Sequence, residues 1–208
     1  MLWRLLVMTL SLSFLFLHPA APSLAAPRVL SMMSWLNEQV RESEMVVLGQ
    51  SQYDSYPDPQ TGTMKVKMLV GQVYSGPRLP PRIEVHVKSG WHGGRFLPPA
   101  PVGREQWVLF FCRSEKGHWV APPLGRIVES RAQGLIFYPP ADVILEDAAP
   151  GLSWSYILDS LTQLVATRKQ IINAYLPKLR VAKTKEQRDR IHMAIEFEVK
   201  DHLGLPLP

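Results

Sequence analysis

The chain of 208 residues contains a single cysteine, no internal repeat and no low-complexity tract. One cysteine cannot form an intramolecular disulfide, which excludes the class of small domains held together by disulfides. Hydrophobic residues make up 46% and charged residues 20% of the chain, a balance that excludes long disorder. No complete catalytic or metal-binding motif is present. We therefore expect one globular domain, or one domain with an appendage, stabilised by its hydrophobic core.

The first 25 residues differ in chemistry from the rest of the chain. Arg4 is followed by an uncharged apolar run, residues 5–17, and then by prolines and small residues. Small residues at Ser23 and Ala25 fit a signal peptidase, so the sequence predicts a secretory signal peptide cleaved after Ala25. The alternative is an uncleaved anchor, although the run is short for a membrane-spanning helix. We expect a secreted or periplasmic mature chain without a transmembrane helix.

The mature chain is mildly basic, and its positive charge is concentrated near the C-terminus. Between Arg168 and Arg190 there are eight basic residues and two acidic ones. An exported basic patch could face anionic envelope polymers or lipid headgroups, and the alternative is an ordinary solvated helix face. The candidate binding residues in this stretch are Lys178, Arg180, Lys183 and Lys185.

Residues 26–149 have the hydrophobic period of β-strands after a short entry helix. The helix is expected over residues 31–42, because apolar residues recur there at spacing four. The clearest strand is residues 63–74, where Met64 and Val66 alternate with Lys65 and Lys67. Further strands are predicted over residues 45–50, 83–88, 105–113, 119–121, 125–130 and 135–138, with a loop over residues 89–103.

From residue 153 the period becomes helical, and residues 150–208 are predicted to form an antiparallel helical hairpin. The first helix is expected to end at Pro177, since proline interrupts helical hydrogen bonding. The second helix is expected to begin at Thr184, because residues 184–187 (TKEQ) have the form of a capping box.

Five segments between residues 43 and 128 follow one another in a recognisable order. They are residues 43–49 (SEMVVLG), 65–71 (KVKMLVG), 73–76 (VYSG), 79–85 (LPPRIEV) and 102–110 (VGREQWVLF). This order resembles the netrin-like, or tissue-inhibitor-of-metalloproteinase-like, family in its bacterial secreted form.

The resemblance implies an OB-like barrel of five or six strands. The predicted fold class is thus mainly β with C-terminal α, with the barrel over residues 26–149 followed by the helical hairpin. The animal inhibitors of this family chelate the zinc of a protease through a Cys-x-Cys at the mature N-terminus. The mature N-terminus of this chain, near Ala26, contains no cysteine, so that activity is not implied.

The glycine-rich segment of residues 89–96 (SGWHGGRF) is the candidate binding loop. Its aromatic rings, Trp91 and Phe96, could stack on a ligand, while His92 and Arg95 could bind anions. The alternative is that the two rings cap the open end of the barrel. A phosphate-binding loop is not supported, because no Lys-Ser/Thr pair follows the glycines.

The sequence offers one candidate for a catalytic pair, Cys112 together with His92 or His118. The apolar residues before Cys112 predict a buried strand, where a thiolate is disfavoured. His86, His92 and His118 match no metal-ligand spacing, so neither a metal nor a cofactor is predicted. We expect a non-enzymatic binding protein of the cell envelope or extracellular space, with another protein as its partner. The alternative is a secreted hydrolase or metal-dependent enzyme that uses Cys112 or His92 and His118.

Nucleic acid is not an expected partner. OB-like barrels that bind single strands use aromatic side chains in a basic groove. Here the barrel region is nearly neutral, and the chain is expected to be exported.

Overall fold

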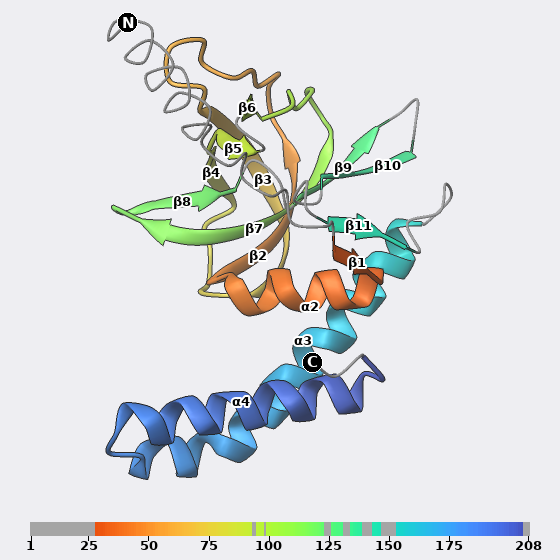
Figure 1. The fold of residues 1–208 in the computed structure, drawn as a ribbon. Helices are drawn as coiled ribbons and strands as arrows, with labels where there is room; N and C mark the ends of the chain where they lie inside the picture. Colours follow the sequence, from red (N-terminus) through yellow and green to blue (C-terminus); the bar gives the residue numbers. More distant parts are fainter. Residues whose placement is uncertain are drawn as a thin grey trace, which may run out of the picture.

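The structure is a computed structural model that describes residues 28–92, 95–97, 99–122, 126–130, 134–138, 143–146 and 153–205. The signal peptide predicted for residues 1–25 lies outside these described residues. Figure 1 shows a β-barrel above a layer of helices, and the last helices of the chain form its C-terminal part.

Five strands close into a barrel. Around the ring the order is β7-β2-β3-β4-β8, and β8 pairs with β7 to complete the circle. Every neighbouring pair is antiparallel except β4 and β8, which are parallel. This connectivity is that of an OB-like barrel and confirms the predicted fold class with five strands. The strands are β2 (Met45–Ser51), β3 (Met64–Ser75), β4 (Arg82–Val87), β7 (Trp107–Glu115) and β8 (His118–Ala121).

Among the described residues, six further strands lie outside the closed ring. β9 pairs with the first half of β7 and with β10, β5 pairs with β6, and β1 pairs in parallel with β11. The expectation of a loop throughout residues 89–103 is wrong at β5 and β6, because strands of three residues are too short to show a hydrophobic period. The bounds are β1 (Arg28–Leu30), β5 (Gly90–His92), β6 (Arg95–Leu97), β9 (Arg126–Ser130), β10 (Gly134–Tyr138) and β11 (Val143–Leu145).

The helices of the described part of the chain are α2 (Met32–Glu42), α3 (Trp154–Val181) and α4 (Lys185–His202). The predicted start of the last helix is confirmed, because Thr184 caps α4 and forms both hydrogen bonds of a capping box with Gln187. The predicted end of α3 at Pro177 is wrong. Pro177 has no N–H, so the carbonyl of Asn173 loses its helical hydrogen bond. Because Asn173 is exposed, water can solvate that carbonyl, and α3 continues past the proline.

Two hydrophobic clusters share the strands β2 and β7, which are buried on both faces. Because side chains alternate along a strand, Met45 and Phe110 point into the barrel, whereas Val46 and Phe111 face the helices. Trp35 of α2 meets Phe111 edge to face, with the ring centroids 5.8 Å apart. Helix α2 therefore lies between the barrel and the C-terminal helices, as Figure 1 shows.

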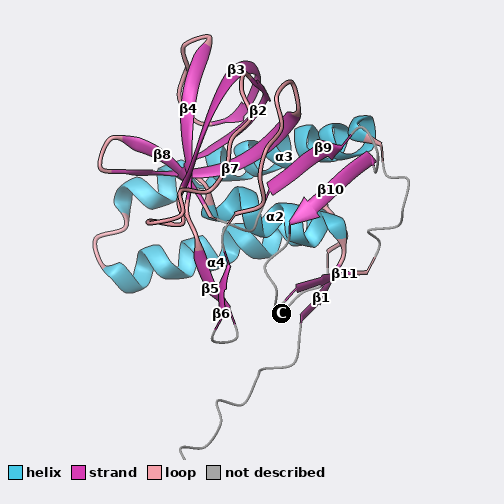
Figure 2. Cartoon of the chain, turned by 90° about the horizontal axis from the view of Figure 1, so that it is seen from above, coloured by secondary structure: helices cyan, strands magenta, loops and turns pink. Residues whose placement is uncertain are grey.

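The two C-terminal helices dock through the first half of α3. Ile157, Leu161 and Leu164 are fully buried against α2 and the outer face of the barrel. Helix α4 then runs back antiparallel to α3, and Figure 2 shows both helices from above the barrel. Within the described part of the chain, no helix is long and apolar enough to cross a membrane.

Candidate binding surfaces

The end of the helical hairpin projects away from the barrel, as Figure 1 shows at the turn between α3 and α4. We call residues 173–193 the distal arm. Ala182 is the one buried residue among them. Tyr175, Leu179 and Ile191 of the arm are half-buried and pack against the helical core, whereas most of its other side chains face solvent.

The distal arm gathers the basic residues that the sequence singled out. Lys178, Arg180, Lys183 and Lys185 are all exposed, where α3 ends and α4 begins. Altogether the arm contains six Lys or Arg residues against two acidic residues, Glu186 and Asp189. It therefore carries a formal excess of four positive charges.

Several of these basic side chains have no acidic partner. Arg180, Lys183 and Lys185 form no ion pair with any described residue. Lys178 lies over the ring of Tyr175, with its nitrogen 4.5 Å from the ring centre. Arg190 pairs with Glu186 at 2.6 Å, one helical turn away. Most of the positive charge of the arm is thus available to an acidic surface.

The capping box at Thr184 orders the turn at the tip of the arm. The amide of Gln187 donates to Thr184 Oγ1 at 3.2 Å. In return, Gln187 Oε1 accepts from the amides of Lys183 and Thr184 at 2.9 and 3.3 Å. These bonds fix the backbone between two of the exposed lysines and reduce the entropy that a partner would have to remove on binding.

The base of the arm is anchored by Arg168 of α3. Its guanidinium donates to both carboxylate oxygens of Glu196 in α4, at 2.6 and 3.1 Å. It also donates to Asn37 Oδ1 in α2 at 2.9 Å. One buried side chain thereby connects three helices, so the arm leaves the barrel in a defined direction.

The four candidate residues of the glycine-rich loop lie on the β5–β6 hairpin. Trp91 is the backbone partner of Phe96, and His92 is the partner of Arg95. The structure thus brings these residues together as two cross-strand pairs. Their side chains are outside what the structure describes, so the predicted binding role of this loop stays a prediction.

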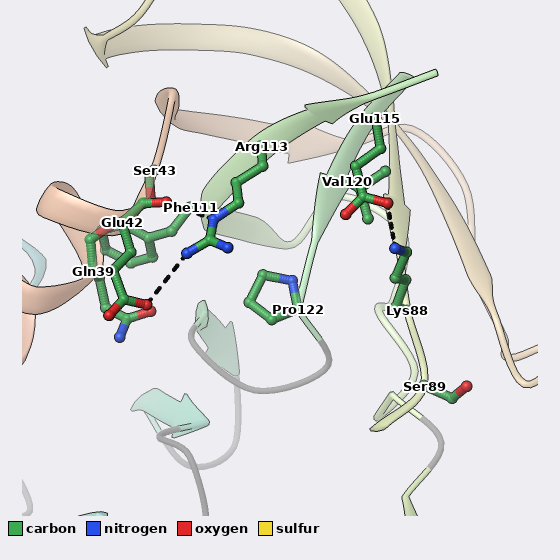
Figure 3. A pocket seen from close by; sticks show the side chains of 10 residues that line it. All are labelled: Gln39, Glu42, Ser43, Lys88, Ser89, Phe111, Arg113, Glu115, Val120 and Pro122. Carbon is green, nitrogen blue, oxygen red and sulfur yellow. Dashed lines mark hydrogen bonds and ion pairs between the residues drawn. The ribbon is translucent and has the colours of Figure 1, made fainter. Parts of the chain in front are cut away.

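A cleft of about 320 Å³ lies where the β5–β6 hairpin leaves β4 (Figure 3). Lys88 pairs with Glu115 on one side of the cleft. On the other side Arg113 Nη2 lies 3.4 Å from a carboxylate oxygen of Glu42. Each basic residue thus faces an acidic one, and the lining carries no unbalanced charge. Phe111, Val120 and Pro122 form its apolar part.

Two of the residues considered for catalysis, Cys112 and His118, lie on opposite sides of the barrel wall, whereas the side chain of His92 is outside what the structure describes. Cys112 is fully buried within the barrel cluster, and burial raises the pKa of its thiol to about 12. His118 instead stacks on His86, with the ring centroids 4.6 Å apart, and His86 Nε2 lies 2.8 Å from a carboxylate oxygen of Glu84. No cluster of three or more described His, Cys, Asp or Glu residues could hold a metal ion.

Two of the side-chain contacts described above could not be predicted from the sequence. The imidazoles of His86 and His118 meet because β4 and β8 pair in parallel, a long-range event that no local pattern encodes. Asn37 and Arg168 are 131 residues apart in the chain. The signal that was present in the sequence was the cluster of basic residues on the helical hairpin.

No protein-family model matches this chain, and no curated protein is significantly similar to it. The netrin-like resemblance consequently rests on the sequence segments alone and stays a prediction.

Proposed function

We propose that this protein is an exported, non-enzymatic binding protein of the cell envelope or extracellular space, and that its distal arm binds an acidic surface on a partner protein. The observation that carries the proposal is the arm itself. It has a single buried residue in residues 173–193, and it holds six basic residues against two acidic ones.

The positive charge of the arm favours binding of an acidic partner and does not stabilise the fold. Like charges close together on a narrow hairpin repel one another, and an acidic partner would relieve that repulsion. Because unpaired charges act over about 8 Å at physiological ionic strength, they would also accelerate and orient the encounter. The anchor at Arg168 supports this role, since it holds the arm in one direction before the partner arrives.

A membrane surface is the second candidate for the arm. Stable membrane attachment combines basic residues with apolar side chains that insert beside them. The exposed large apolar side chains of the arm are Leu176, Val181 and Met193, and the exposed Phe197 follows in α4. Adducts with lipid alone in the experiment below would assign the arm to a membrane instead of a protein.

The alternative of a hydrolase that uses Cys112 is less well supported. A catalytic thiol must be accessible and must ionise near neutral pH. The thiol of Cys112 is inside the barrel, and its raised pKa keeps it protonated at neutral pH.

Photo-crosslinking in intact cells that produce the protein tests the proposal. A photoreactive residue at position 185 probes the arm, the same residue at position 91 probes the β5–β6 hairpin, and position 65 on the exposed face of β3 is the control. The proposal predicts one discrete protein adduct at position 185 that Lys178→Glu removes, and none at position 65. Adducts with lipid alone, or protein adducts equally abundant at position 65, would refute it.

Export is tested separately by the N-terminus of the mature protein. The proposal predicts that mass spectrometry of the envelope or medium fraction finds a chain that begins at Ala26. An intact chain in the cytoplasmic fraction would contradict the exported location.

A further inference from the structure

A groove of about 480 Å³ lies between the barrel and the base of the helical hairpin. It is bounded by the end of α2, the end of β3 and the middle of α3. Its size is within the range of small-molecule sites, which often form where separate parts of a fold meet. None of its lining residues belongs to the distal arm except Asn173, so the inference below does not depend on the proposed function.

The charged side chains that line this groove are all basic. Arg41, Arg168 and Lys169 contribute to its lining, and no aspartate or glutamate does. Lys169 forms no ion pair with any described residue. Arg41 pairs with Glu42 at 3.3 Å, but Glu42 is shared with Arg113. Unlike the cleft of Figure 3, the groove therefore has an unbalanced positive charge.

Arg168 gives the groove a fixed hydrogen-bond donor. Glu196 balances its charge, so the unbalanced charge of the groove comes from Arg41 and Lys169. The side chain of Arg168 is 10% exposed, and its ion pair with Glu196 and its bond to Asn37 hold it in place. The Nε–H of Arg168 makes no hydrogen bond with the described residues. A donor that is already oriented binds an anion at a smaller entropic cost than a free arginine.

Neutral donors lie beside these cations. The pKa of Tyr74 is raised, first by burial and second by the charge of Asp159, so its phenol stays protonated and can donate. The side-chain hydroxyl of Ser75 and the side-chain amide of Asn173 form no hydrogen bond with described residues. Such groups complete the coordination of a carboxylate or phosphate.

The rest of the lining is apolar and comes from both sides of the groove. It consists of Val40 of α2, Val73 of β3, and Val165 and Ile172 of α3. A ligand that contacts both the basic part and the apolar part of the lining has an anionic group at one end and an apolar chain at the other. We infer that this groove binds a soluble organic anion, a carboxylate or phosphate carried on a short alkyl-like chain.

Isothermal titration calorimetry of the full mature chain tests this inference. The probes are octyl phosphate and octanoate below their micelle concentrations, with ethyl phosphate and inorganic phosphate for comparison. We expect saturable binding of the octyl probes, and binding at least about tenfold weaker for ethyl phosphate because it cannot cover the apolar wall.

Lys169→Gln identifies the site, because Lys169 is exposed and its replacement leaves the core intact. We expect it to weaken octyl phosphate binding about tenfold. Lys183→Gln, which removes the same charge from the distal arm, is the matched control and should leave the affinity unchanged.

Three results would overturn the inference. The first is no saturable binding of either octyl probe, and the second is equal weakening by Lys169→Gln and Lys183→Gln. The third is binding to phosphatidylglycerol vesicles without binding of the soluble probes, since that would assign the positive charge to a membrane surface. Because Lys169 is outside the distal arm, each result is independent of the crosslinking outcome at position 185.

Discussion

Arg168 and Glu196 form a two-point ion pair, with nitrogen-to-oxygen distances of 2.6 and 3.1 Å, at the place where α3, α4 and α2 meet. The two side chains are 10% and 25% exposed. The pair is therefore much less screened by water than an ordinary surface salt bridge. It also determines where the hairpin leaves the barrel, because a third bond joins Arg168 to Asn37.

Glu196→Ala should lower the free energy of unfolding by about 2–3 kcal/mol, since it leaves the buried guanidinium without its carboxylate. Urea unfolding followed by circular dichroism measures the loss. Glu186→Ala is the matched control, because Glu186 also pairs with an arginine at 2.6 Å but both side chains are more than 70% exposed. Its cost should be below about 0.5 kcal/mol. Equal losses in the two variants would show that the anchor is not stabilising.

Gly49→Ala should be among the most destabilising single-methyl changes in the barrel. A Cβ at Gly49 would lie 2.5 Å from the carbonyl oxygen of Leu69, at a register shift between β2 and β3. A backbone atom cannot move aside as the end of a flexible side chain can. We therefore expect the free energy of unfolding, measured in urea, to fall by about 3 kcal/mol.

Gly117→Ala is the control for the glycine prediction. Gly117 has a φ of +82°, but nothing lies within 4 Å of its added Cβ. Its cost should be limited to about 1–2 kcal/mol of backbone strain. A smaller loss for Gly49→Ala than for Gly117→Ala would contradict the close approach of β2 and β3.

The thiol of Cys112 should be unreactive in the folded protein. With a pKa of about 12, roughly one thiol in ten thousand is ionised at pH 8, and burial blocks the reagent as well. Ellman's reagent should therefore react at once in guanidinium chloride and only slowly without it. Rapid reaction of the native protein would revive the hydrolase alternative.

The buried thiol of Cys112 should make the free energy of unfolding fall at alkaline pH. Its pKa is raised from the ordinary 9.0 to about 12 on folding, so its contribution to the free energy of unfolding is fully present below pH 9. As the pH rises above 9, the unfolded chain loses the proton while the folded chain keeps it, and stability falls by up to about 1.4 kcal/mol per pH unit. Cys112→Ala should lack this component when the two proteins are unfolded in urea at pH 8 and pH 10. Parallel pH dependence of the two proteins would contradict the raised pKa.

The parts of the fold that the sequence predicted are those encoded locally. Met64 and Val66 alternate with lysines and are buried in β3, and the residues from Thr184 to Gln187 cap α4 as expected. The basic side chains of the arm were predictable as a cluster because they are close in the chain.

The parts that were missed depend on contacts between distant segments. The groove beside Arg168 needs residues of α2, β3 and α3, which no window of sequence contains. The continuation of α3 past Pro177 depends on the exposure of Asn173 at that point of the helix. In both cases tertiary placement decides a feature that local propensity leaves open.

The measurement that tests the central claim most directly is the yield of the protein adduct at position 185 in intact cells, compared between the native arm and an arm with Arg180→Glu and Lys183→Glu. Both residues are exposed and form no ion pair with described residues, so the double variant should fold as the native protein does. If the arm binds an acidic surface, the adduct should disappear while the thermal midpoint stays unchanged. An undiminished adduct in a normally folded variant would show that the positive charge of the arm does not recognise the partner.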